Sequence, residues 1–216
     1  MATDRLALYN IALFDLGDRK LDSLTEAREP RFLLDEVFTR GGGAIRAVLE
    51  QGLWNHAIRT VQIDKSASIT PAFGYPNAFD MPTNFVRLVQ ISPGENFLGT
   101  LMRYEIEAGI LYTDVDPIFM RFVSDSSDYG NDLSLWPETF TLWVGHWLGQ
   151  QIMAKLLNDK DQEAYMKRGK RLLADARSKD AQQEPTRWPP LSSWASARLN
   201  RVGPRRDRGS RSQLTG

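Results

Sequence analysis

The chain of 216 residues contains no cysteine, only two histidines and no long apolar run. Without cysteine it can form neither a disulfide nor a thiolate zinc site, and it has no thiol nucleophile. His56 and His146 are too few for a histidine-rich metal site. The longest apolar clusters, near residues 142–148 and 11–14, are too short to cross a bilayer. We therefore expect no targeting segment, no membrane partner and synthesis in a cytoplasm.

Catalytic patterns are also scarce. Asp114 and Asp116 could act as paired carboxylates, but Asp-Val-Asp-Pro is a common turn composition and no further ligand is spaced nearby. Gly41–Gly43 lacks the Lys-Ser/Thr of a phosphate-binding loop. A single histidine among aromatic residues is more often packed than catalytic. We therefore expect no enzyme activity, no catalytic residue, no metal and no cofactor, and a hydrolase using the two aspartates is the weakest alternative.

The net charge of zero conceals an uneven distribution along the chain. The 27 Lys and Arg residues cancel the 27 Asp and Glu residues. However, residues 185–216 contain seven arginines and one acid, Asp207, so this segment carries +6 and residues 1–184 carry −6. Such asymmetry indicates a docking surface or a polyanionic partner.

Apolar periodicity predicts four helices. The first covers residues 4–16 and ends at Gly17, where a left-handed residue would close it. The second begins near Leu24, has Pro30 in or near its first turn, and runs to about Gly52. Because its apolar phase resumes after Gly41–Gly43, we expect one weakened helix rather than two. The third begins at Trp136-Pro137, and the fourth covers about 161–182.

Residues 55–135 have the pattern of short strands separated by glycine and proline. Strand-like runs occur at 58–63, 85–91, 104–107, 110–113 and 118–123, which predicts a small antiparallel sheet or sandwich. The expected fold is therefore α+β. Residues 1–54 and 136–184 would form an antiparallel four-helix bundle, residues 55–135 an inserted small antiparallel β domain, and residues 185–216 an extended basic C-terminal arm.

The arm is the strongest polar feature of the sequence. Solvated termini seldom carry two tryptophans, whereas aromatic residues and arginine are common anchors in docking segments. We favour docking on a protein, with phosphate binding or a solvated terminus as alternatives. The candidate docking residues are Trp188, Trp194, Arg198, Arg201, Arg205, Arg206, Arg208 and Arg211.

Several patterns occur together, in order, over about residues 4–184. A long helical region ends in Ala47-Val48-Leu49-Glu50-Gln51-Gly52-Leu53-Trp54-Asn55-His56-Ala57. Phe79-Asp80-Met81-Pro82-Thr83-Asn84-Phe85-Val86-Arg87-Leu88 follows, and then the runs 104–113 and 119–123. The helix 136–157 and the closing run 174–183 complete the set. In this order the patterns resemble the phage head-to-tail connector, or adaptor, of the tail tubular protein A type. The chain departs from that family at Leu53, where proline is usual, at His56, where an aromatic residue is usual, and at Gly41–Gly43.

The resemblance implies a structural protein of the virion, located at the head–tail interface of the portal vertex. Such adaptors form a ring, usually of twelve copies, under the portal protein. They extend the DNA channel, through which the genome passes without sequence-specific binding, and provide a platform for the tail nozzle or tail tube protein. The candidate residues for packing between subunits are Trp54, Phe140, Trp143 and Trp147. A DNA-binding assembly factor, acting through the arginine-rich arm, is the alternative function.

Overall fold

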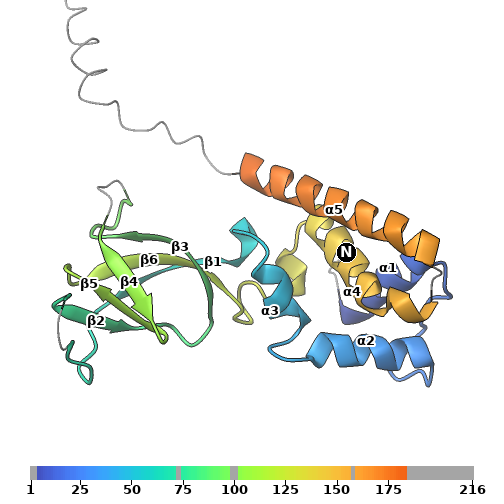
Figure 1. Ribbon diagram of the computed structural model, residues 1–216, viewed down its shortest axis with the longest axis horizontal. Helices are drawn as coiled ribbons and strands as arrows, with labels where there is room; N and C mark the ends of the chain where they lie inside the picture. The colour runs from blue at the N-terminus through green and yellow to red at the C-terminus, as the bar shows by residue number, and fades with distance from the viewer. Residues whose placement is uncertain (1–3, 72–73, 98–101, 157–158, 184–216) are drawn as a thin grey trace, which may run out of the picture. The chain divides into compact units, whose positions relative to one another are not determined.

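The computed structural model describes residues 4–71, 74–97, 102–156 and 159–183. The chain divides into two units, Met1–Glu184 and Pro185–Gly216, and every described residue belongs to the first. The helices are α1 (Arg5–Leu16), α2 (Glu29–Thr39), α3 (Ala44–Leu49), α4 (Glu138–Leu156) and α5 (Asp159–Gln182). The strands are β1 (Ile58–Ile63), β2 (Asn77–Asp80), β3 (Phe85–Ser92), β4 (Tyr104–Glu107), β5 (Ile110–Thr113) and β6 (Ile118–Ser124). Two short 3-10 helices, η1 (Asn55–Ala57) and η2 (Leu133–Leu135), connect the helices with the strands (Figure 1).

Helix α1 has the predicted limits and packs on α4. The Asp4 side chain accepts a hydrogen bond from the Ala7 amide, and Gly17 closes the helix in the left-handed conformation. Gly145 lets α1 approach α4 closely, since a Cβ atom there would lie 2.4 Å from Ile11 Cγ2. Leu8 and Leu13 are fully buried at this contact. The first predicted helix is therefore confirmed.

The second predicted helix is wrong in extent, because it is two helices. It begins at Glu29 rather than near Leu24, and α2 ends before Arg40. Gly43 has φ 90° and ψ 153°, a region of backbone space that is essentially confined to glycine. That conformation cannot continue a helix, so α3 begins anew at Ala44. The helical spacing of apolar residues does resume after Gly43, but on a separate helix.

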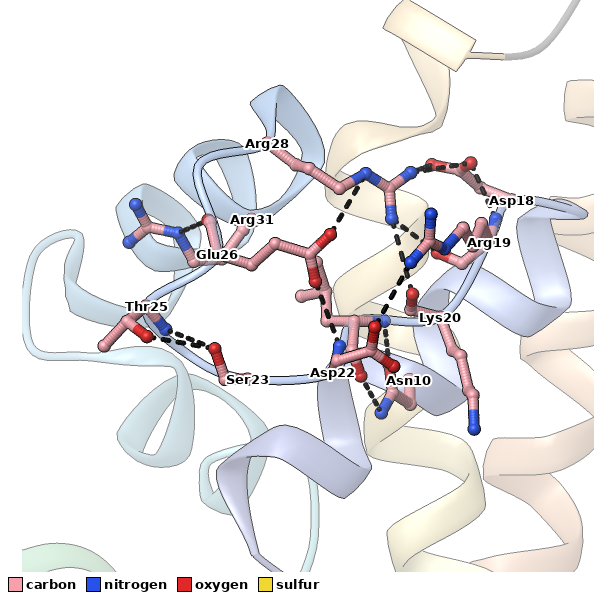
Figure 2. Close-up of polar contacts among 11 residues, drawn as sticks. Asn10, Asp18, Arg19, Lys20, Asp22, Ser23, Thr25, Glu26, Arg28 and Arg31 are labelled. Carbon is pink, nitrogen blue, oxygen red and sulfur yellow. Dashed lines mark hydrogen bonds and ion pairs between the residues drawn. The ribbon is translucent and has the colours of Figure 1, made fainter.

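The segment between α1 and α2 is held by side chains instead of regular structure (Figure 2). Asn10 accepts a hydrogen bond from the Leu21 amide at 2.7 Å and donates one to the Leu21 carbonyl at 3.1 Å. Arg28 donates to the Arg19 carbonyl and pairs with Asp18. These bonds fix the turn in place, so α2 is held against α1 by the connection as well as by packing.

The strands form two antiparallel three-stranded sheets, in the orders β1-β6-β3 and β2-β5-β4. The five strand-like runs read from the sequence are confirmed, and β2 is an addition to them. Phe79 and Leu111 of the second sheet share a buried cluster with Ile118, Met120 and Phe122 of β6. The two sheets therefore enclose one apolar core.

The first sheet also contributes to the core of the helical part. Val123 of β6 is fully buried in the same cluster as Leu8, Leu49 and Trp143, and Val86 and Val89 of β3 pack against that cluster. Arg46 of α3 pairs with Asp125 at 2.8 Å and donates to the Phe85 carbonyl. The helices and the first sheet are thus packed together.

The predicted antiparallel four-helix bundle with an inserted β domain is therefore wrong. The protein is α+β with five α-helices and two small three-stranded antiparallel sheets within the described residues. The error has two causes. Glycine geometry divides the second helix, and non-local strand pairing places β6 between β1 and β3, where one of its residues reaches the helical core.

Candidate interaction surfaces

His146 lies in a buried polar cluster that joins three helices. Its Nδ1 is 2.8 Å from Asp15 Oδ2 of α1, and its Nε2 is 3.0 Å from the Tyr165 carbonyl oxygen of α5. The two ring nitrogens are thus held from both sides, one by a side chain of α1 and the other by the backbone of α5. Arg168 pairs with the other oxygen of Asp15 at 3.1 Å. This histidine is fully buried, and it holds helices together instead of facing a substrate.

Tyr165 completes this cluster. Its ring stacks on the His146 ring with centroids 3.9 Å apart, and its hydroxyl donates to the His146 carbonyl. Burial raises the pKa of Tyr165 well above its ordinary value, and the Asp15 charge adds to that effect. The phenol therefore stays neutral, and its function is in packing.

His56 occupies an aromatic pocket. Its ring centroid is 4.7 Å from that of Phe140 and 6.3 Å from that of Trp136, and neither of its buried ring nitrogens has a hydrogen-bond partner among the described residues. Desolvation by burial lowers the pKa of His56 to about 4. The ring is therefore neutral at pH 7 and takes the place that an aromatic side chain would fill.

The remaining sequence candidates for chemistry are parts of turns. Asp114 and Asp116 lie between β5 and β6, and Asp116 accepts a hydrogen bond from the Lys65 amide and pairs with its ammonium group at 3.5 Å. Gly41–Gly43 joins α2 to α3. Among the described residues, no group of three or more His, Asp or Glu side chains could hold a metal ion. Nor does any helix of the described part of the chain have the length and apolarity needed to cross a membrane.

The predicted docking residues lie outside the described residues. These are Trp188, Trp194, Arg198, Arg201, Arg205, Arg206, Arg208 and Arg211. The residues predicted to pack between subunits are described. Trp54 stacks on Trp143 at 5.5 Å and meets Phe140 edge to face at 4.6 Å, and all three are buried among residues of the same chain. Trp147 is partly buried against the same cluster.

A concave surface near the end of α5 contains two arginine guanidinium groups, and both already donate hydrogen bonds to backbone carbonyls. Arg87 donates to the Glu50 carbonyl, and Arg177 donates to the Gln51 carbonyl. These carbonyls follow α3, where helix ends leave acceptors without partners. Asp180 accepts from the Asn55 amide at 3.0 Å and so ties α5 to the same corner. The surface is therefore a structural junction.

An apolar groove lies on the helical part, between α1, α4 and α5. We refer to it as the α1–α4–α5 groove. Its volume is about 470 Å³, and its lining is mostly aliphatic and aromatic. Phe14 is 81% exposed and Leu142 is 39% exposed. The lining residues are Ala7, Asn10, Ile11, Phe14, Asp15, Leu142, Arg168 and Leu172.

Another exposed apolar residue lies on α2. Phe32 is 54% exposed, and Glu29 and Glu36 are exposed three and four residues away from it. Residues at these spacings share one face of a helix. The Arg31 guanidinium lies over the Phe32 ring, 4.0 Å from its centroid. We call this surface the α2 knob, defined by Glu29, Phe32 and Glu36.

The charges of residues 1–184 are also distributed unevenly along the sequence. Residues 55–135 contain ten acidic and five basic residues, so this segment holds −5 of the −6 carried by residues 1–184. Glu105 and Glu107 are exposed on β4, which is an edge strand. In contrast, Lys167, Arg168, Lys170 and Arg171 are exposed on α5, and no acid occurs from Ala164 to Ala174.

A search found no protein-family model and no curated protein that matches the chain.

Proposed function

We propose that this chain is a structural head-to-tail adaptor of a tailed phage. It forms a ring under the portal protein, extends the channel for the genome, and provides the platform on which the tail nozzle or tail tube protein assembles. In this proposal it works in the virion without enzyme activity. The observation that carries the proposal is the separation of charge between an acidic strand-forming segment, with ten acids and five bases, and a terminal segment of +6.

The acidic segment suits a wall along which DNA moves. Phosphates are repelled by carboxylates, and binding of DNA needs Lys and Arg to release its counterions. Glu105 and Glu107 on the exposed β4 strand supply such carboxylates at a sheet edge. The arginine-rich terminal segment has the opposite sign, so it suits an acidic protein surface.

The order of sequence patterns supports the same proposal. The adaptor pattern has an aromatic residue where this chain has His56. The neutral His56 ring lies between Trp136 and Phe140, a pocket that an aromatic side chain would fill. The departure of the sequence from the pattern at this position therefore leaves the aromatic packing intact.

Binding to the portal protein of the same phage tests the proposal. The full chain is expected to co-sediment with portal rings, and negative-stain class averages should show an added ring beneath them. Deletion of residues 185–216 should abolish binding, and replacement of Trp188 and Trp194 by alanine should weaken it by about tenfold or more. Leu24→Ala, at an exposed position on the body, is the control and should bind as wild type does. Absence of any complex between the full chain and portal would refute the adaptor function.

The exposed basic residues of α5 favour a second candidate, a DNA-binding assembly factor. Lys167, Lys170 and Arg171 would add to the arginines of the terminal segment. This candidate predicts tight binding of duplex DNA in a filter assay, whereas an adaptor should bind DNA weakly and lose it steeply with salt. Tight, salt-resistant and sequence-specific binding would favour the assembly factor.

A further inference from the structure

We propose that the free edge of β4 receives an extended segment of a partner protein, which adds antiparallel to β4 and carries basic side chains opposite Glu105 and Glu107. Strand β4 pairs with β5 on one side, and within the described residues no strand lies on its other side. All four of its residues are exposed. Such an edge can bind a strand of another chain through backbone hydrogen bonds. The inference goes beyond the proposed function and does not depend on it, since residues 55–135 keep eight of their ten acids against five bases when β4 is covered.

The register of the β4–β5 hairpin shows which backbone groups of β4 face the free edge. Glu107 pairs with Ile110 across a two-residue turn, and both turn residues have positive φ. In such a hairpin the pair next to the turn exchanges hydrogen bonds, and hydrogen-bonded pairs then alternate with non-hydrogen-bonded ones. The amides of Glu105 and Glu107 therefore point to β5, whereas the N–H and C=O groups of Tyr104 and Ile106 point to the free edge.

Strand β4 lacks several features that commonly prevent pairing at a sheet edge. Proline, lysine and bulges protect many natural edge strands. β4 contains neither proline nor lysine, and its register with β5 is regular, whereas β3, at the edge of the other sheet, has two register shifts. The side chains of Tyr104 and Ile106 are also 45% and 41% exposed. An added strand would cover this apolar surface as well as the free backbone groups.

Two carboxylates of β4 select a basic partner. Glu105 and Glu107 share one face of the strand, because alternate residues point to the same side. The residues opposite them on β5 are Tyr112 and Ile110, so neither glutamate faces a cation across the hairpin. Both glutamates line a cleft of about 400 Å³ together with Tyr75 and Tyr112. A lysine or arginine of the added strand would pair with a carboxylate there and pack against a tyrosine ring.

Arg103 sets the register of the added strand. It is exposed directly before β4, and its spacing places it on the same face as the two glutamates. A matching strand therefore carries two bases opposite the glutamates, an apolar residue between them opposite Ile106, and no base opposite Arg103. A second copy of β4 fits less well, because its single Arg103 can meet only one of the two glutamates in any antiparallel register.

Synthetic peptides test the inference by fluorescence anisotropy with the full chain. The probe is a labelled peptide, Thr-Arg-Val-Arg-Val-Glu-Thr, whose arginines come opposite Glu107 and Glu105 and whose glutamate comes opposite Arg103. The control peptide, Thr-Arg-Arg-Val-Val-Glu-Thr, has the same composition without the alternation of a strand. The probe should bind more tightly than this control by about tenfold or more. Equal binding would mean attraction of charge alone, and absence of binding would mean a closed edge; either result would overturn the inference.

Charge reversal on β4 supplies the matched variants. A chain with both Glu105→Lys and Glu107→Lys should lose affinity for the probe by about tenfold or more and should gain affinity for the sign-reversed peptide, Thr-Glu-Val-Glu-Val-Arg-Thr. The control chain, with Glu95→Lys and Asp128→Lys, has the same change of net charge at two exposed positions outside β4 and the cleft, and should bind the probe as wild type does. Circular dichroism checks that both variants are folded. A β4 variant that keeps the affinity of wild type contradicts the proposal.

Amide hydrogen exchange in the wild-type chain locates the contact without any substitution. Saturating probe should slow exchange at the Tyr104 and Ile106 amides by about tenfold or more, because these amides face the free edge. The amides of Glu105 and Glu107 already face β5 and should change little. Protection that is absent, or confined to residues outside β4, would place the peptide elsewhere and refute the proposed edge.

Sedimentation velocity of the chain alone tests a second copy as the occupant. Ile106→Pro removes the amide that faces the free edge and leaves the hydrogen bonds to β5 in place. This variant should lose affinity for the probe, and the wild-type chain should show no self-association that the substitution removes. A wild-type dimer that Ile106→Pro abolishes would mean that β4 pairs with another β4, and the basic partner strand would be wrong.

Discussion

Replacing His56 by phenylalanine should make the protein less sensitive to acid. The ring packs against Phe140 and Trp136, and in the part of the chain that the structure describes both of its buried nitrogens lack a hydrogen-bond partner. Protonation would place a charge in this pocket, and burial therefore lowers the pKa of His56 from 6.5 to about 4. Phenylalanine fills the same space and cannot be protonated.

The sign of the effect follows from proton binding in the two states. Above pH 6.5 His56 is neutral whether the chain is folded or unfolded, so it adds no pH dependence. As the pH falls below 6.5, the unfolded chain binds a proton that the folded chain refuses, and stability decreases. The loss is about 2 kcal/mol at pH 5 and reaches about 3 kcal/mol below pH 4, at 1.36 kcal/mol per pKa unit.

Urea unfolding of wild type and His56→Phe at pH 7.5 and pH 5 measures this loss. The difference in unfolding free energy between the two proteins removes the contribution of the carboxylates that they share. That difference should grow by about 2 kcal/mol in favour of the variant on going to pH 5. With only two histidines in the chain, a proton NMR titration should also resolve the midpoint of His56. A difference that does not change with pH, or a midpoint near 6.5, would refute the reasoning.

Three further predictions concern stability. Asp15→Asn should lower the free energy of unfolding by about 1–3 kcal/mol, because the Asp15 carboxyl group contacts both the buried His146 ring and the Arg168 guanidinium; an unchanged urea midpoint would contradict this. Gly43→Ala should cost about 1–3 kcal/mol at φ 90°, whereas Gly94→Ala, with nothing within 4 Å of the added Cβ, should cost little; equal melting temperatures would contradict this. Leu111→Ala should cost about 2–5 kcal/mol in the core between the sheets, and exposed Leu24→Ala should not, as thermal unfolding will show.

Local patterns predicted most of the elements. Helix α1 ends at Gly17 because a left-handed residue is needed there, and alternation marked five of the six strands. Strand β2 was missed because Asn77–Asp80 is short and carries little alternation. The predicted extent of the second helix was wrong because apolar residues that regain helical spacing after Gly43 are equally compatible with one helix and with two.

The interaction surfaces were less accessible to sequence reasoning. Phe14 and Phe32 fit the apolar periodicity of their helices, so nothing local marks them as exposed. Arg168 and Asp15 are far apart in sequence, and their pairing depends on how α5 lies on α1. The signal that could have indicated the groove is the run of basic residues from Lys167 to Arg171, next to an apolar helix face.

By itself, the sequence determined most of the segments that become helices and strands, where α1 begins and ends, and how charge is divided between residues 1–184 and the terminal segment. These properties depend on neighbours within a few residues. Only the tertiary structure decided that β6 lies between β1 and β3, that Val123 joins the helical core, and that His146 lies between Asp15 and the Tyr165 carbonyl. Each of these depends on groups that are distant along the chain, and burial and pairing exist only once those groups are brought together.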